Sequence, residues 1–226
     1  MYIQLNGQII YYERNGEGKC PLLLLHGNGE DHTIFNSMIS AYQAEYDIIA
    51  PDTRGHGQSA TPSEYHYNDF ATDLILLIEA LELVNPLVIG YSDGAITAML
   101  AAMERPDLFG GIILCGGNLT PDGIVKKEYR LLKKAYKRAD ASPLTKLLYE
   151  EPNIPERFLS RIKCPALVMA GENDLIKPEE TKKIAKEIPG SKLYILPGED
   201  HGSYATDPVK MKPYVDELAV MTSRIS

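Results

Sequence analysis

Short runs of apolar residues alternate along this chain with segments whose apolar residues recur at helical spacing. The runs occupy residues 21–26, 46–52, 86–91, 112–115, 166–170 and 193–196. Runs of this length are typical of strands that are buried on both faces of a parallel sheet. We therefore expect six buried strands, preceded by a β-hairpin over residues 2–13 that turns at Asn6-Gly7.

Helical segments are expected between these strands, at residues 69–83, 93–105 and 178–188. In the first segment, Phe70, Leu74 and Leu77 belong to one apolar stripe, and Asp73 is among the polar residues expected to lie off that stripe. The alternation of strands and helices predicts an α/β fold in which helices cover both faces of the sheet.

The region at about 118–160 interrupts this alternation. About four dozen residues separate the strand that ends near residue 117 from the strand that starts near residue 165, and most loops are far shorter. Apolar and aromatic residues recur at helical spacing at Val125, Tyr129, Leu132 and Tyr136. We therefore expect one domain over residues 1–226, with a small helical cap inserted at about 118–160.

The expected cap differs in charge from the rest of the chain. Residues 121–140 carry seven basic and three acidic side chains, a net charge of +4. The whole chain has a net charge of −8, which leaves −12 for the remainder. Two interpretations stay open: a solvated basic face whose apolar side covers the site, or a surface that steers an anionic substrate towards it.

Length and charge exclude several classes of protein. A chain of 226 residues suits one large domain that needs no disulfide or metal. A net charge of −8 argues against nucleic-acid binding and against polybasic membrane docking, which both need a basic surface. The apolar runs are far shorter than the ~20 residues that span a bilayer, and the start of the chain lacks signal-peptide features. We therefore expect a cytoplasmic protein that binds neither nucleic acid nor membrane.

The cysteines and the absence of known metal-binding motifs indicate a protein without disulfides or metals. Cys20, Cys115 and Cys164 are odd in number and far apart, which predicts three buried thiols in a reducing compartment. The sequence contains no CxxC, HExxH or EF-hand pattern. We expect no metal and no cofactor.

The sharpest chemical signal is Gly90-Tyr91-Ser92-Asp93-Gly94, which fits the pattern G-x-S-x-G between an expected strand and an expected helix. A strand that turns sharply into a helix strains its corner residue and needs small flanking residues, which Gly90 and Gly94 supply. Ser92 should then project from the carboxyl end of the sheet. The N–H groups of the first helical turn should point at the same space, where the helix dipole favours negative charge.

A serine nucleophile needs a base, and the base needs an acid that orients it. His201 follows the last expected strand and is the best candidate base. Asp174 follows the strand at 166–170 and is the best candidate acid, with Glu172 as its nearest rival. All three groups lie at the carboxyl ends of expected parallel strands, where open α/β sheets bind ligands. Ser92, Asp174 and His201 are therefore the predicted catalytic residues.

An oxyanion hole needs two donors from separate segments. One is the backbone N–H of Asp93, the residue after the nucleophile. The second is expected from the loop after the strand at 21–26, where Gly27 and Gly29 flank Asn28 and let the backbone approach a ligand. We predict the N–H of Asn28 as that donor, and interpret His26 as a histidine that braces the loop.

These motifs, taken together, resemble the α/β-hydrolase superfamily. The matching segments follow the family's order and are residues 26–29, 52–59, 90–94, 171–174 and 200–202. The resemblance covers nearly the whole chain apart from about 118–160. It implies the α/β-hydrolase fold, with an eight-stranded, mostly parallel sheet flanked by helices and a small helical cap, and hydrolysis through a covalent acyl-enzyme. It also implies that residues 52–59 form a structural loop near the site. The Ser-Asp-Gly form of the elbow is similar to that of some esterases that act on amino-acid esters.

The expected function is that of a carboxylesterase-like serine hydrolase, whose partner is a small-molecule acyl substrate. Two alternatives stay open. One is a ligand-sensing protein on a hydrolase scaffold with slow catalysis. The other is an enzyme with the same three residues that cleaves a thioester, lactone, amide or C–C bond. A dinucleotide-binding fingerprint at residues 55–60 is disfavoured, because residues 61–63 do not open a helix.

Overall fold

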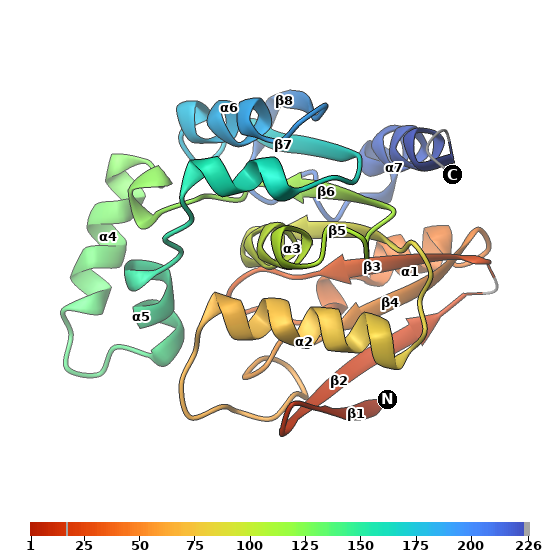
Figure 1. Cartoon of the computed structure of the whole chain (residues 1–226). Helices are drawn as coiled ribbons and strands as arrows, with labels where there is room; N and C mark the ends of the chain where they lie inside the picture. The colour runs from red at the N-terminus through yellow and green to blue at the C-terminus, as the bar shows by residue number, and fades with distance from the viewer. Residues whose placement is uncertain (17, 224–226) are drawn as a thin grey trace.

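Eight strands form one mixed sheet in the computed structural model, which describes residues 1–16 and 18–223 (Figure 1). The strands are β1 (Tyr2–Leu5), β2 (Gln8–Asn15), β3 (Cys20–Leu25), β4 (Tyr46–Pro51), β5 (Leu87–Tyr91), β6 (Gly111–Cys115), β7 (Ala166–Asn173) and β8 (Lys192–Asp200). Their order across the sheet is β1-β2-β4-β3-β5-β6-β7-β8. The pairs β1–β2 and β2–β4 are antiparallel, and all the other pairs are parallel. The eight-stranded, mostly parallel sheet predicted from the sequence is confirmed.

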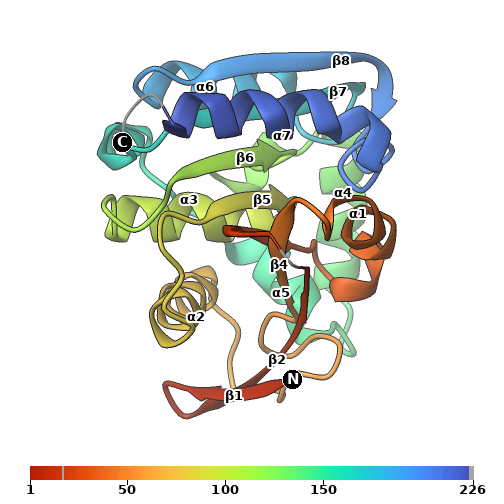
Figure 2. The same ribbon diagram turned by 90° about the vertical axis from the view of Figure 1, so that its right-hand side faces the viewer.

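Helices cover both faces of this sheet, as predicted. They are α1 (Asn36–Tyr42), α2 (Tyr67–Ala80), α3 (Asp93–Glu104), α4 (Lys126–Tyr136), α5 (Pro143–Glu150), α6 (Pro178–Glu187) and α7 (Pro208–Ser223), with short 3-10 turns η1 (His32–Phe35), η2 (Pro121–Gly123) and η3 (Glu156–Arg161). The apolar sides of α2, α3 and α6 pack on one face, and those of α1 and α7 pack on the other (Figure 2). Two buried apolar layers therefore enclose the central strands.

The N-terminal hairpin turns at the predicted dipeptide. Asn6 and Gly7 have φ angles of +46° and +77°, which are the left-handed values that a tight two-residue hairpin turn requires. Tyr2 and Tyr11 then lie opposite each other, with their ring centroids 5.0 Å apart. The hairpin leads into the central sheet through the pairing of β2 with β4.

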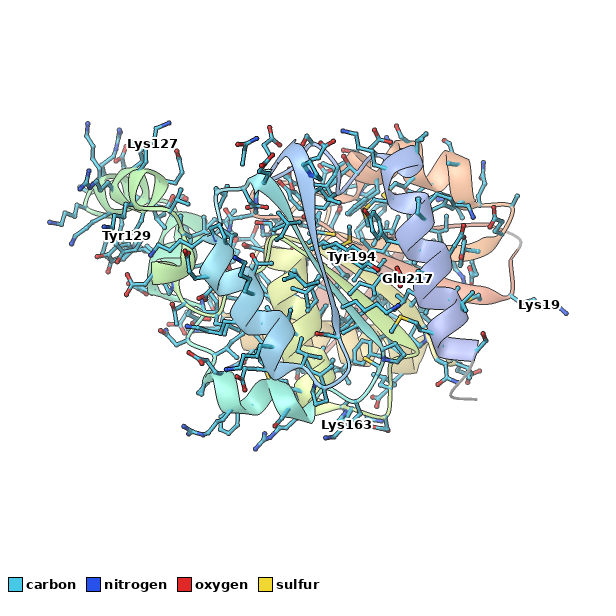
Figure 3. All side chains as sticks on the ribbon, turned by 90° about the horizontal axis from the view of Figure 1, so that it is seen from above. Lys19, Lys127, Tyr129, Lys163, Tyr194 and Glu217 are labelled. Atoms are coloured by element: carbon cyan, nitrogen blue, oxygen red, sulfur yellow. The ribbon has the colours of Figure 1, made fainter. Side chains whose placement is uncertain are left out.

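The helices α4 and α5 occupy the long connection between β6 and β7, and they project to one side of the sheet (Figure 1). They contact each other through stacked tyrosines: the ring of Tyr149 lies 5.8 Å from that of Tyr129 and 4.1 Å from that of Tyr136. The opposite face of α4 carries lysines and arginines that extend into solvent, among them Lys127 (Figure 3). The amphipathic pattern read from the sequence thus corresponds to α4.

The prediction that every strand of the parallel sheet is buried is wrong for β8. This strand lies at the edge of the sheet and pairs only with β7. Tyr194 faces α7, where its hydroxyl donates to the carboxylate of Glu217 at 2.7 Å (Figure 3). On the other face of the strand, Leu193 and Ile195 are each 38% exposed. An apolar run predicts that a strand forms, but the burial of the strand depends on which other strands and helices pack against it.

The prediction that Asp73 lies on the polar side of its helix is also wrong. Asp73 is 6% exposed, and its carboxylate accepts two hydrogen bonds of 2.7 Å from the guanidinium of Arg54. The Arg54 side chain is buried too, and each charge makes burial of the other tolerable. This pair fastens the loop after β4 to α2.

The three thiols are free among the described residues, as the odd count suggested. Cys115 and Cys164 are buried, whereas Cys20, predicted to be buried, is only half-buried because it opens β3 at the end of the sheet. Burial raises the pKa of all three thiols. Within the described ranges, no helix combines the length and the apolar character needed to cross a membrane.

Candidate active site

Ser92 occupies the sharp corner between β5 and α3. Its φ of +53° and ψ of −114° lie in a region that side-chain-bearing residues rarely adopt, so the corner stores backbone strain. The flanking glycines are required by space: a Cβ on Gly90 would lie 2.4 Å from the carbonyl oxygen of Gly94. A Cβ on Gly94 would lie 2.1 Å from the carbonyl oxygen of Leu25. The corner therefore has the geometry of a nucleophile elbow.

Hydrogen bonds join the three predicted side chains into one chain. The Ser92 Oγ lies 3.0 Å from Nε2 of His201, and Nδ1 of His201 lies 2.7 Å from Oδ1 of Asp174. The Asp174 carboxylate also accepts the backbone N–H groups of Ile176 and Gly171 at 2.9 and 3.2 Å. Both Asp174 oxygens accept backbone N–H groups, so the carboxylate suits an N–H donor at Nδ1 of His201, and Nε2 then faces the serine hydroxyl as an acceptor.

The topology explains why these residues meet. Ser92, Asp174 and His201 each follow the carboxyl end of a parallel strand, namely β5, β7 and β8. The rival acid Glu172 instead accepts the backbone N–H of Gly198 at 2.9 Å and is exposed. The structure therefore brings the predicted set together, with Asp174 and not Glu172 on the histidine.

The loop after β3 lies directly against the elbow. A Cβ on Gly27 would come within 3.1 Å of Cβ of Ser92, which is tighter than an ordinary contact, so glycine favours this close approach. The side-chain amide of Asn28 donates to Oδ2 of Asp93 across the gap, at 2.9 Å. The two residues predicted to supply the oxyanion-binding N–H groups are thus in direct contact, and their part in catalysis stays a prediction.

His26 and Glu30 hold this loop in shape. The Glu30 carboxylate accepts the N–H of Gly27 at 3.0 Å, and Nδ1 of His26 contacts the carbonyl of Gly27 at 2.8 Å. On its other side, Nε2 of His26 accepts the N–H of Thr53 at 3.0 Å. Burial lowers the pKa of His26 to about 4, so this imidazole is neutral at pH 7. These contacts agree with the bracing role expected for His26.

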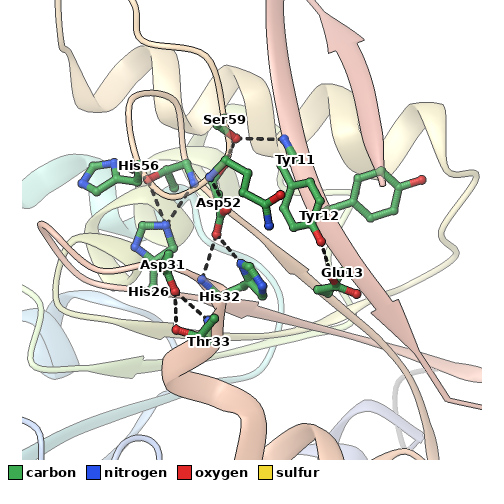
Figure 4. A network of polar contacts seen from close by, with 12 residues as sticks. Tyr11, Tyr12, Glu13, His26, Asp31, His32, Thr33, Asp52, His56 and Ser59 are labelled. Atoms are coloured by element: carbon green, nitrogen blue, oxygen red, sulfur yellow. Dashed lines mark hydrogen bonds and ion pairs between the residues drawn. The ribbon is translucent and has the colours of Figure 1, made fainter.

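A buried polar network holds the loop of residues 52–59 beside the site (Figure 4). Asp52 is fully buried, and its carboxylate accepts the backbone N–H and the Nδ1 of His32 as well as the N–H of Gln58. Ser59 Oγ donates to the carbonyl of Asp52 at 2.6 Å. Within the described residues, Asp31, His32 and Asp52 form the one group whose ligand atoms lie close enough to share a metal. Both Asp52 oxygens already accept hydrogen bonds, which fits a structural network better than a metal centre.

A cleft of about 280 Å³ opens above Ser92 and His201. Besides Gly27 and Asn28, its walls combine apolar and acidic side chains, which are Ile124, Leu132, Leu148, Leu175, Tyr91, Glu30 and Glu128. Glu30 lies close to His201 and is half-buried, and that burial raises its pKa. Among the described residues that line the cleft, His201 is the one basic side chain, so the field inside the cleft opposes a negatively charged ligand.

Sequence reasoning missed Glu30 and Glu128. Glu30 lies two residues after Asn28 in the same loop, and this nearness was a usable signal. Glu128 lies on α4 one helical turn before Leu132, so both residues share the helix face that turns to the cleft. Glu128 was not singled out because the lysines and arginines around it make this helix read as a basic surface.

Asp93 is buried at the first position of α3 and is only 4% exposed. Burial raises its pKa to about 6, and the hydrogen bond from Asn28 opposes that rise. This carboxyl group is therefore buried at the start of α3 and hydrogen-bonded to the loop after β3.

Comparisons with known proteins agree with this geometry. The family model of the alpha/beta hydrolase fold matches residues 21–147, more than half of the chain, so the chain belongs to the α/β-hydrolase family. It is 29% identical to the human protein "Serine hydrolase BPHL" over 88% of this chain and 79% of that protein. It is 24% identical to "Uncharacterized hydrolase YugF" of Bacillus subtilis, over 85% of this chain and 87% of that one.

Solved structures share the fold. The esterase RhEst1 from Rhodococcus sp. ECU1013 superposes with a TM-score of 0.82 at 21% identity, over all of this chain and 98% of the esterase. The enol-lactonase from Burkholderia xenovorans LB400 gives a TM-score of 0.81 at 19% identity, over 97% of this chain and 100% of the lactonase. At these identities the likeness shows the fold alone.

Proposed function

We propose that this chain is a serine hydrolase that cleaves a small carboxylic ester, or a related acyl compound, through a covalent acyl-enzyme on Ser92. The observation that carries the proposal is the unbroken chain of hydrogen bonds from Ser92 through His201 to Asp174. A serine held on a strained corner, hydrogen-bonded to an imidazole that a carboxylate orients, has the arrangement that activates a hydroxyl for acyl transfer. Membership in the α/β-hydrolase family adds support.

In the acylation half-reaction, Ser92 Oγ attacks the ester carbonyl carbon while Nε2 of His201 takes the serine proton. Asp174 stabilises the imidazolium that forms, and the backbone N–H groups of Asn28 and Asp93 bind the oxyanion. Collapse of the tetrahedral intermediate breaks the bond between the carbonyl carbon and the alcohol oxygen. His201 returns its proton to the departing alcohol, and the acyl group remains on Ser92.

Deacylation repeats these steps with water. His201 takes a proton from a water molecule as that water attacks the acyl carbon, and the same two N–H groups bind the second oxyanion. The bond between Ser92 Oγ and the acyl carbon then breaks, and Ser92 regains its proton from His201. The products are one carboxylic acid and one alcohol, with the enzyme unchanged.

The charge of the cleft narrows the substrate class. Glu30 and Glu128 line it, so a neutral or cationic ester is favoured over an anionic one. The cleft is lined by Glu128 of α4 and by none of the basic residues of that helix that the structure describes, which weakens the idea that α4 steers an anionic substrate. Lys127 lies 3.5 Å from the Glu128 carboxylate and offsets part of its charge. We keep the prediction of a cytoplasmic protein, which the three free cysteines support.

The experiment that tests this proposal follows p-nitrophenyl acetate hydrolysis together with labelling by a fluorophosphonate. The wild type should turn over many times per molecule and should gain one phosphonyl group on Ser92, located by peptide mass spectrometry. Ser92→Ala should lose both properties, while the matched control Ser63→Ala, which alters an exposed serine, should keep them. A Ser92→Ala variant with full activity overturns the proposal, and a single turnover per molecule favours a sensor.

A further inference from the structure

We infer that the side chains of Asn28 and Asp93 are positioning residues for the oxyanion hole, because their hydrogen bond sets the distance between its two halves. The inference rests on the proposed function and concerns how that site is built. The two backbone N–H groups that bind the oxyanion come from different segments, the loop after β3 and the start of α3. Their spacing is therefore not fixed by the local chain.

The contact itself is specific. The Asn28 Nδ2 lies 2.9 Å from Oδ2 of Asp93, and the Asp93 side chain is buried, so water competes little for this carboxylate. A hydrogen bond to a buried, charged acceptor is stronger than one between neutral groups in water. The same two residues supply both the donors and the bond that joins them.

The other hydrogen bonds of the loop after β3 do not connect it to the elbow. Glu30 ties the loop to its own Gly27, and His26 ties it to Thr53, which lies after β4. Among the hydrogen bonds of the described residues, the Asn28–Asp93 bond is the one that links this loop to the elbow. Without it, the N–H of Asn28 can move relative to the N–H of Asp93.

Such movement matters because an oxyanion hole acts only when both donors are in place before charge develops. A misplacement of about 1 Å can cost about a hundredfold in rate. Loss of the side-chain bond should therefore reduce kcat more than it raises KM, since the ground-state ester uses these donors less than the tetrahedral intermediate does.

The test is a double-mutant cycle built from Asn28→Ala, Asp93→Ala and the combined variant. Both single substitutions keep the backbone N–H groups and remove the side-chain bond; Asp93→Ala also removes a buried carboxyl group, which the Asp93→Asn variant below controls for. Each should lower kcat for p-nitrophenyl acetate about tenfold to a hundredfold with little change in KM. The combined variant should lose little more than the worse single variant, because the bond is already absent.

Two further measurements separate positioning from a general loss of structure. Inhibition by a trifluoromethyl ketone, which forms a tetrahedral adduct with the serine, should weaken in proportion to the loss of kcat/KM. Asp93→Asn keeps an oxygen that accepts the Asn28 bond, so it should recover a large part of what Asp93→Ala loses. The melting temperature of each variant is recorded alongside, and variants that unfold below the assay temperature are replaced by Asn28→Ser.

The outcomes distinguish the two proposals. An active wild type with an Asn28→Ala variant within twofold of it in kcat overturns the inference and leaves the proposed function standing. Losses that multiply in the combined variant overturn it as well, because independent effects show no coupling. A wild type that neither turns over the ester nor reacts with the fluorophosphonate overturns the proposed function and the inference with it.

Discussion

The imidazole of His201 packs directly against Gly116, where a Cβ would lie 2.7 Å from the Cε1 atom of the ring. Gly116 follows β6 and has a φ of +65°, a left-handed value that favours glycine. The ring cannot move away from such a Cβ without disturbing the hydrogen bonds of its two nitrogens to Ser92 and Asp174. The position of the histidine therefore depends on the absence of a side chain at Gly116, directly after β6.

Gly116→Ala should accordingly displace the His201 ring and reduce kcat for p-nitrophenyl acetate about a hundredfold. The measurement is steady-state kinetics, with the rate of fluorophosphonate labelling as a second readout of Ser92 activation. The matched control is Gly190→Ala, which also replaces a glycine of positive φ but meets no atom within 4 Å of its new Cβ. Equal rates for Gly116→Ala and the wild type would show that the ring tolerates displacement.

The acidic lining of the cleft predicts discrimination by substrate charge. Glu128→Gln removes one carboxylate and keeps the shape of the side chain, so kcat/KM for an ester with a carboxylate in its acyl group should rise about threefold to tenfold. The neutral ester of equal size should change by less than twofold, and added salt should shrink the difference.

The control for this experiment is Glu179→Gln, which removes an exposed carboxylate on α6. It changes the net charge by the same amount, so any effect of overall charge appears in both variants. An anionic ester that is hydrolysed faster than its neutral analogue by the wild type would contradict the reading of the cleft and favour steering by α4.

The core of the site was predictable because it depends on patterns within single segments. A glycine-flanked serine after an apolar run marks a strand-to-helix corner, and parallel strands place their carboxyl ends along one edge. Ser92, Asp174 and His201 each follow such a run, so their meeting required only the correct sheet. The resemblance to the α/β-hydrolase family supplied the strand order that the runs alone do not define.

The features that the sequence did not predict depend on contacts between segments that are distant in the sequence. The buried pair of Asp73 with Arg54 places a charge where a helical stripe predicts a surface. Whether Leu193 is covered depends on which strand ends the sheet. The bond from Asn28 to Asp93 spans 65 residues, and no local pattern specifies the side-chain conformations that close it.

Glu151 connects the end of α5 to the start of α2, and this connection should depend on pH. Its carboxylate accepts the N–H of Tyr67 at 3.1 Å and contacts Nδ1 of His66 at 2.7 Å. The hydrogen bond to Glu151 raises the pKa of His66. A histidine whose pKa is raised on folding stabilises the protein fully below its unfolded pKa, and this contribution is lost as pH rises through the folded pKa.

Glu151→Ala should therefore lower the free energy of unfolding by about 1 kcal/mol through loss of the helix cap. The difference in the free energy of unfolding between the wild type and this variant should be larger at pH 5.5 than at pH 9. The two differences should themselves differ by less than about 1 kcal/mol, because the His66 side chain is half-exposed. Urea unfolding at the two pH values measures this difference. Glu64→Ala is the control, since Glu64 is more exposed and lies 3.6 Å from Nε2 of His66. A loss of unfolding free energy in Glu151→Ala that grows as pH rises would contradict the stabilising contact between His66 and Glu151.

The buried carboxyl of Asp93 should make the protein less stable at neutral pH than its amide counterpart. Its pKa rises from 3.8 to about 6 on folding, so between these values the folded state binds more protons than the unfolded state. The free energy of unfolding then falls as pH rises through this window, and it stays reduced above pH 6. Asp93→Asn removes this cost, and a pKa shift of this size corresponds to about 3 kcal/mol.

Urea unfolding of the wild type and Asp93→Asn, compared at pH 7.5 and pH 4, measures the effect. The variant should be the more stable protein at pH 7.5, and the advantage should shrink towards zero at pH 4, where the wild-type carboxyl is protonated in the folded state. Asp122→Asn, on an exposed carboxyl, should show no such dependence.

Higher stability together with lower kcat in Asp93→Asn would mean that this charge is kept for function at the expense of stability. A variant that is less stable than the wild type at pH 7.5 would instead show that the hydrogen bonds of the carboxylate outweigh its burial.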